Sequence, residues 1–107
     1  FKKNTIKKIN VEINCLSDFM EQHSIKKIDI LKIDTEGYEF SVIKGAKKRI
    51  KDVKYIYFEH HFDNMLQKKY TFFDIHSYLT KNGFTKKLKI KMSFRKTFEY
   101  IYQNTKM

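Results

Sequence analysis

Two acidic residues, Asp34 and Glu36, stand two positions apart directly after a short apolar run. The run, Ile28–Ile33, is rich in β-branched residues and predicts a buried strand. Helical spacing follows it, with four apolar residues on one face: Val42, Ile43, Ala46 and Ile50. Ligands bind beyond the carboxyl ends of strands in open α/β sheets, so the two carboxylates are candidates for ligand binding or proton transfer. Acidic residues are also favoured at helix starts without any functional role.

A second polar group follows the next apolar run, Val53–Phe58, which ends in Glu59 and His60. The helix between the two runs supplies the crossover that neighbouring parallel strands need. If the strands are such neighbours, Glu59 and His60 lie at the same sheet edge as Asp34 and Glu36. The sequence therefore predicts one site built from two strand ends.

A divalent metal is a further reading of these residues. Oxygen ligands from Asp34, Glu36 and Glu59 would suit Mg²⁺ or Ca²⁺, and His60 would suit a transition metal. Adjacent strand residues point to opposite faces, so His60 and His61 cannot easily share a ligand. No Cys pair or His spacing is diagnostic of a metal site, and the sequence predicts none.

The other elements of the first half follow from local pattern. Alternation predicts a short half-buried strand at Ile9–Ile13, and helical spacing predicts about two turns of helix over Leu16–His23. A longer helix is expected from about Tyr38 to Lys51. Gly45 inside it costs helix stability, which either close packing against the sheet or a break in the helix would explain.

The second half predicts a helix followed by a β-hairpin. Thr71–Asp74 matches a capping box, and Gly83 is placed to end the helix that it starts. Two strands follow, Phe84–Met92 and Thr97–Gln103, joined by a turn. Alternate side chains are expected to form a buried face in the first strand, with Leu88, Ile90 and Met92. In the second strand, Phe98, Tyr100 and Tyr102 are expected to face one way.

Composition favours one small folded domain. The chain has 107 residues, of which 41% are hydrophobic, so disorder is not expected. The formal net charge is +11, but nearly all the basic residues are lysines, which suit a solvated face or a protected strand edge, so nucleic-acid binding is not expected. One cysteine, no membrane-spanning run and no signal peptide favour a cytoplasmic protein.

The central motif resembles the signature of the FkbM methyltransferases. The resemblance rests on Leu31–Glu39, Lys-Ile-Asp-Thr-Glu-Gly at its centre, and on Val-Ile-Lys-Gly-Ala at Val42–Ala46. Leu16-Ser-Asp18 is similar to an upstream element of the family, with serine in place of its first aspartate. Tyr55–Glu59 is similar to the family's next strand, which also ends in Glu. The close similarity runs from about Val11 to His61.

The resemblance implies the C-terminal half of a Rossmann-like class I methyltransferase fold: an α/β domain with a mostly parallel sheet ending in an antiparallel hairpin. Such enzymes bind S-adenosylmethionine mainly through a glycine-rich turn in their first half. This chain has only three widely spaced glycines, so residues 1–107 are expected to form a partial domain, inactive alone, whose cofactor-binding half is absent.

The resemblance also implies roles for the predicted site residues. Asp34, Glu36 and Gly37 would contact the cofactor, and either Asp34 or His60 would act as the general base. Glu59 and His60 would line the acceptor pocket, or Glu59 would hold His60 in place. The expected reaction is O-methylation of a small molecule or glycan.

A non-catalytic reading remains open beside the enzyme. The basic hairpin could make this chain an α/β interaction module that binds an acidic partner. The acids at the strand ends favour the enzyme, because an interaction module does not need them. An exposed sheet edge would also favour self-association.

Overall fold

The computed structural model describes residues 15–35, 37–62, 69–91 and 97–107. The elements are the helices α1 (Leu16–Gln22), α2 (Glu39–Lys44), η2 (a 3₁₀ helix, Lys47–Asp52) and α3 (Phe72–Lys81), and the strands β1 (Ile28–Ile33), β2 (Val53–His61), β3 (Phe84–Lys91) and β4 (Thr97–Asn104). The strand predicted at residues 9–13 and the turn near residues 93–96 lie outside the described residues.

The four strands form one mixed sheet in the order β1-β2-β4-β3. The neighbours β1 and β2 are parallel, as predicted. β4 pairs antiparallel with both β2 and β3, because the hairpin returns the chain to the middle of the sheet. The prediction of a mostly parallel sheet is therefore wrong for the described strands, of which only one pair is parallel.

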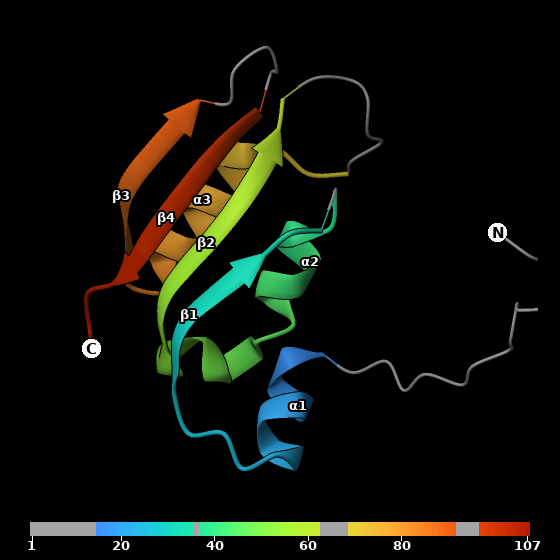
Figure 1. Cartoon of the computed structure of the whole chain (residues 1–107), viewed down its shortest axis with the longest axis vertical. Coiled ribbons are helices and arrows are strands. Elements are labelled where there is room, and N and C mark those ends of the chain that lie inside the picture. The colour runs from blue at the N-terminus through green and yellow to red at the C-terminus, as the bar shows by residue number, and fades with distance from the viewer. Residues whose placement is uncertain (1–14, 36, 63–68, 92–96) are drawn as a thin grey trace, which may run out of the picture.

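Helices cover one face of this sheet. Figure 1 looks onto the other face, with α3 behind β2 and β4. The helix-covered face holds the core, where Phe58 stacks on Tyr100 and Tyr102 with ring centroids 5.5 and 5.8 Å apart. Ile75 and Leu79 of α3 are fully buried in the same core. The prediction that Phe98, Tyr100 and Tyr102 face one way is confirmed: Tyr100 and Tyr102 are 1% and 0% exposed in the core, and Phe98 packs against it.

The uncovered face of the sheet carries exposed apolar side chains. Ile30 is 64% exposed, and it lines a shallow apolar hollow with Tyr55, Tyr57 and Ile101. No described helix covers these residues (Figure 1). The sheet therefore presents two chemically different faces.

The predicted buried face of β3 is wrong for the described part of that strand. Leu88 and Ile90 are each 45% exposed, and Phe84 is the only buried residue between Phe84 and Lys91. β3 is an edge strand with a register shift after Lys86. Alternation marks two faces of a strand, but a face is buried only where another element packs on it.

Both predicted boundaries of α3 are confirmed. The Asp74 N–H donates to Thr71 Oγ1 (3.3 Å) and the Thr71 N–H donates to Asp74 Oδ2 (2.8 Å), which completes the capping box. Gly83 follows the helix with φ of 89°, a conformation that favours glycine.

The single helix predicted from about Tyr38 to Lys51 is interrupted. α2 ends before Gly45, and η2 begins two residues later. The Ser17 N–H donates to the Gly45 carbonyl (3.0 Å), and a Cβ at Gly45 would lie 3.3 Å from Cys15 Cβ. The helix is therefore broken at Gly45, and the closest neighbours of this glycine belong to the start of α1 and to α2 rather than to the sheet.

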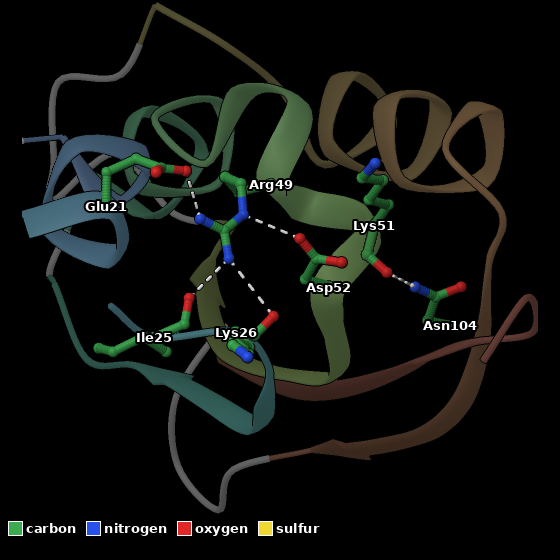
Figure 2. Close-up of polar contacts among 7 residues, drawn as sticks. All are labelled: Glu21, Ile25, Lys26, Arg49, Lys51, Asp52 and Asn104. Carbon is green, nitrogen blue, oxygen red and sulfur yellow. Dashed lines mark hydrogen bonds and ion pairs between the residues drawn. The ribbon is translucent and has the colours of Figure 1, made fainter. Parts of the chain in front are cut away.

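Arg49 ties η2 to α1 and to the segment before β1 (Figure 2). Its guanidinium donates to the carboxylates of Asp52 (2.8 Å) and Glu21. It also donates to the carbonyl oxygens of Ile25 (2.6 Å) and Lys26 (3.3 Å). The planar fork of arginine suits this set of four acceptors, which a lysine could not bind together.

Candidate functional site

The carboxyl ends of β1 and β2 meet at one edge of the sheet. Ile33 pairs with Phe58 in the parallel ladder, so the next residues, Asp34 and Glu59, lie at the same level of the sheet. Asp34 is exposed, and Glu59 is 23% exposed. This part of the predicted assembly is present. Glu36 lies outside the described residues.

The acids of this edge gather around Tyr57 on the uncovered face. The Tyr57 hydroxyl donates to Glu99 Oε2 (2.7 Å) from the neighbouring strand. The pKa of Tyr57 is raised, first by this hydrogen bond, then by burial, and then by the charges of Glu99, Glu59 and Asp34. Lys32 lies over the Tyr57 ring at 5.4 Å from its centroid. This end of the uncovered face therefore carries negative charge, and Lys32 lies beside it.

His60 lies on the opposite, helix-covered face. Its Nδ1 is 2.7 Å from Glu39 Oε2, and the two side chains are 2% and 1% exposed. Glu39 is the first residue of α2, so the contact joins the start of that helix to the end of β2. The structure thus brings Asp34 and Glu59 together but turns His60 away from both.

The Glu39 carboxyl is held in its ionised form. Burial alone would raise the pKa of Glu39, but the hydrogen bond from His60, together with backbone and Tyr70 interactions, lowers it below its ordinary value. An ionised carboxylate can only accept a hydrogen bond, so His60 must carry a proton on Nδ1. In the neutral imidazole this leaves Nε2 with the free lone pair.

Tyr70 completes the polar group beside Glu39. Burial, followed by the hydrogen-bonding and charge effects of Glu39, raises the pKa of Tyr70 above the range in which it could ionise near neutral pH. Neither Tyr70 Oη nor Glu39 Oε1 makes a hydrogen bond of standard geometry within the described residues. Sequence reasoning missed both residues: Glu39 is visible only as the last residue of the motif, and Tyr70 follows a stretch without a pattern.

Aromatic rings enclose His60. The ring centroids of Phe62, Phe72 and Tyr70 lie 4.7, 5.8 and 6.0 Å from that of the imidazole. The surroundings of the imidazole are therefore apolar, except for Glu39 and the Tyr70 hydroxyl. This aromatic enclosure shields the hydrogen bond between His60 and Glu39 from water and strengthens it.

The prediction that Glu59 fixes His60 is wrong. Glu59 points to the other face of β2, where its Oε1 lies 3.6 Å from Nε2 of His61. Consecutive residues of a strand alternate between faces, so Glu59 pairs with the histidine two positions on and not with the next one. The partner of His60 comes from α2.

The turn between β1 and α2 contains a glycine with positive φ and an exposed aromatic residue. Gly37 has φ of 88°, which glycine adopts without strain, and Tyr38 after it is 68% exposed.

No group of three or more potential metal ligands occurs within residues 15–35, 37–62, 69–91 and 97–107. In the same residues, no helix is long and apolar enough to cross a membrane.

Comparison with known protein families identifies the chain. The methyltransferase FkbM domain matches residues 1–86 of the 107. The chain belongs to the FkbM methyltransferase family. The resemblance seen in the sequence is thereby confirmed, and the match reaches from Phe1 into β3. No curated protein and no solved structure matches the chain.

Membership of the FkbM family indicates which chemistry to expect at the carboxyl ends of β1 and β2. The FkbM domain implies a Rossmann-like methyltransferase fold, and its members generally use S-adenosylmethionine. The mixed α/β sheet observed in this chain agrees with that fold. The motif that identified the family is the segment that carries Asp34, Gly37 and Glu39.

Proposed function

We propose that this FkbM protein transfers a methyl group from S-adenosylmethionine to a hydroxyl oxygen of a small molecule or glycan. The observation that carries the proposal is the exposed carboxylate of Asp34 at the joined ends of two parallel strands, within the family motif. Ligands of open α/β sheets bind at this position.

Asp34 is the better candidate for contact with the reacting groups. A general base must come within hydrogen-bond reach of the proton that it removes. Asp34 is exposed at the edge, whereas His60 is 2% exposed and bonded to Glu39. We therefore assign proton acceptance to Asp34. His60 becomes a positioning residue that acts through Glu39 on the turn carrying Asp34.

The residues at this edge fit one side of the cofactor. S-adenosylmethionine carries a positive sulfonium that supplies the methyl group, and a carboxylate such as Asp34 suits that charge. Gly37, with its positive φ, lets the backbone approach a ligand closely, and the acids of the uncovered face, Glu59 and Glu99, can accept hydrogen bonds from an acceptor hydroxyl. Glu36 stays a predicted cofactor contact outside the described residues.

We also propose that this chain represents only part of a methyltransferase domain. The chain lacks a glycine-rich turn for the cofactor, since its three glycines are widely separated. We infer that residues 1–107 correspond to the C-terminal half of a class I methyltransferase domain and that the glycine-rich turn belongs to an upstream half. Self-association through an exposed sheet edge and a cytoplasmic location stay predictions.

A calorimetric titration with S-adenosylmethionine tests the proposal. The full-length product of the reading frame that contains this sequence is compared with its Asp34→Ala variant. The matched control is Asp29→Ala, which removes the same charge from an exposed position at the other end of β1. We expect binding that is at least tenfold weaker in Asp34→Ala and unchanged in Asp29→Ala.

Failure of the folded full-length protein to bind would contradict the proposal. The non-catalytic module would then be the better account, because the exposed lysines of β3 could serve an acidic partner. Equal weakening in both variants would instead mean that Asp34 acts only through net charge.

A further inference from the structure

A lysine-rich hollow lies at the end of the sheet opposite Asp34. In Figure 1, η2 (the unlabelled green helix below β2) and the C terminus lie near the start of β2, and the arrowheads of β1 and β2 point away from them. The hollow has a volume of about 360 Å³. Five of its eight lining residues are lysines; the lining comprises Lys47, Lys48, Ile50, Lys51, Lys81, Asn82, Asn104 and Lys106.

No carboxylate lines this lysine pocket. Among the described residues, none of its five lysines forms an ion pair. The nearby acid Asp52 already binds Arg49, which lies in η2 between Lys48 and Lys51 (Figure 2). All five lysines are exposed to solvent. Positive charges gathered without a counter-ion repel one another, and an anion bound among them would reduce this repulsion.

Buried hydrogen bonds hold the lysine-bearing segments in place. Asn104 is 1% exposed, and its side-chain amide donates to the carbonyl oxygens of Lys51 and Val53 (3.1 Å each). Its Oδ1 accepts the backbone N–H of Lys106 (3.0 Å). One buried amide therefore fixes the main chain at two of the five lysines, and Figure 2 shows its link to Lys51.

Gly83 shapes the same pocket through its missing side chain. A Cβ at Gly83 would lie 2.9 Å from Cε and 3.0 Å from Cδ of Lys106, so the stem of that lysine lies across the glycine. The Gly83 carbonyl accepts both the backbone N–H (2.9 Å) and the hydroxyl (2.8 Å) of Thr105. The C-terminal segment is thus fastened beside α3 with Lys106 at the pocket.

Lys47 adds a second sign of a built site. Its φ of 51° is unusual for a residue other than glycine, and such strain concentrates at functional positions. The backbone there places two consecutive lysines, Lys47 and Lys48, on one wall of the hollow.

We propose that the lysine pocket binds a small anion bearing two or more linked phosphates. The size of the hollow suits a ligand of this kind, and five lysines match its several negative charges. Lysine is a point charge with three donors, and it binds phosphate oxygens without the planar geometry that arginine requires. The site lies at the far end of the sheet from Asp34 and does not depend on methyl transfer.

Calorimetry with inorganic tripolyphosphate at constant ionic strength tests this site in the full-length protein. The Lys48→Gln/Lys106→Gln variant removes two pocket charges. The control, Lys27→Gln/Lys87→Gln, removes two charges from exposed positions that do not line the pocket. We expect the pocket variant to bind at least tenfold more weakly than wild type and the control to bind within threefold of it, with circular dichroism confirming that both fold.

Three results would overturn the proposal. The first is no binding of tripolyphosphate to the folded wild-type protein, and the second is equal weakening by both pairs of substitutions. The third is tighter binding of a single-stranded oligonucleotide than of tripolyphosphate, weakened by either pair, which would replace the pocket with an extended nucleic-acid surface. Tenfold weakening in the pocket variant alone would support the site.

Discussion

The two ends of the sheet carry opposite charge and are built in different ways. At the carboxyl end of β1 and β2, three acids gather around Tyr57 on the uncovered face: Asp34, Glu59 and Glu99. At the other end, five lysines line one hollow without a carboxylate. The net charge of +11 therefore hides a separation of charge along the strands.

The ends also differ in how their charged groups are stabilised. At the acidic end, a buried pair, Glu39 and His60, holds α2 to β2, and the exposed acids lie beside this rigid support. At the basic end, the Arg49 guanidinium binds two carboxylates, while Lys51 and Lys106 are held through their main chain. We infer that the acidic end is organised before any ligand arrives, and that the basic end requires an anion for full stability.

Removing the buried carboxylate should have the largest effect. Glu39→Ala leaves His60 buried without its partner and is expected to lower the free energy of unfolding by about 3 kcal/mol. Glu59→Ala, which disrupts the partly exposed and longer contact with His61, should cost less than about 1 kcal/mol. Urea denaturation measures both. Equal effects of the two substitutions would show that the Glu39–His60 pair is no more important than a surface contact.

Breaking the arginine clamp should have the next largest effect. Arg49→Met removes hydrogen bonds to two carboxylates and two carbonyls, and it is expected to lower Tm by several degrees. Lys48→Met, one residue away and of the same charge change, should leave Tm unchanged or slightly raise it. Differential scanning calorimetry compares them. A fall in Tm for both would contradict the distinction between the paired arginine and the unpaired lysine.

Acid should weaken the acidic end through Glu39. The pKa of Glu39 in the folded protein lies below its ordinary value of 4.5, because the hydrogen bond from His60 and smaller effects outweigh the opposing effect of burial. Its carboxylate therefore stabilises the fold above pH 4.5, and this contribution is lost as the pH falls from 4.5 through the lowered pKa.

Glu39→Gln removes this titration and keeps a hydrogen-bond acceptor for His60. The free energy of unfolding of the Glu39→Gln variant should fall less than that of wild type between pH 5 and pH 3. Urea denaturation at each pH measures it. Parallel pH profiles for the two proteins would show that Glu39 is not the group responsible.

Screening should produce the smallest effect, at the basic end. Added salt weakens repulsion among the pocket lysines, so moderate NaCl is expected to raise the Tm of wild type slightly. Lys48→Gln/Lys106→Gln should show less of this rise, whereas Lys27→Gln/Lys87→Gln should keep it. The same salt response in all three proteins would mean that the pocket lysines do not interact.

Local sequence patterns predicted most of the elements of this fold. The two parallel strands, the capping box at Thr71–Asp74 and the common face of alternate residues in β4 are encoded by residues close in the chain. Local pattern left open whether the helix breaks at Gly45, and it did not predict the exposure of β3. These features depend on how the start of α1 packs against Gly45 and on the position of β3 at the edge of the sheet.

The same distinction between local pattern and long-range contact applies to the site residues. Asp34 and Gly37 follow from a continuous motif that also identified the family. The partner of His60 could not be predicted, since Glu39 lies 21 residues earlier and on another element. The lysine pocket was equally hidden, because its residues come from η2, the end of α3 and the C-terminal segment.

Amide chemical-shift mapping tests the division of labour between the two ends most directly. The isotope-labelled full-length protein is titrated with S-adenosylhomocysteine, the stable product of methyl transfer from the cofactor. We predict that, within this chain, the largest shifts fall on Asp34, Thr35, Gly37 and Tyr38, while the residues of the lysine pocket stay unchanged. Shifts centred on Lys47 to Lys51, with Asp34 to Tyr38 unmoved, would contradict the assignment of methyl-transfer chemistry to the acidic end.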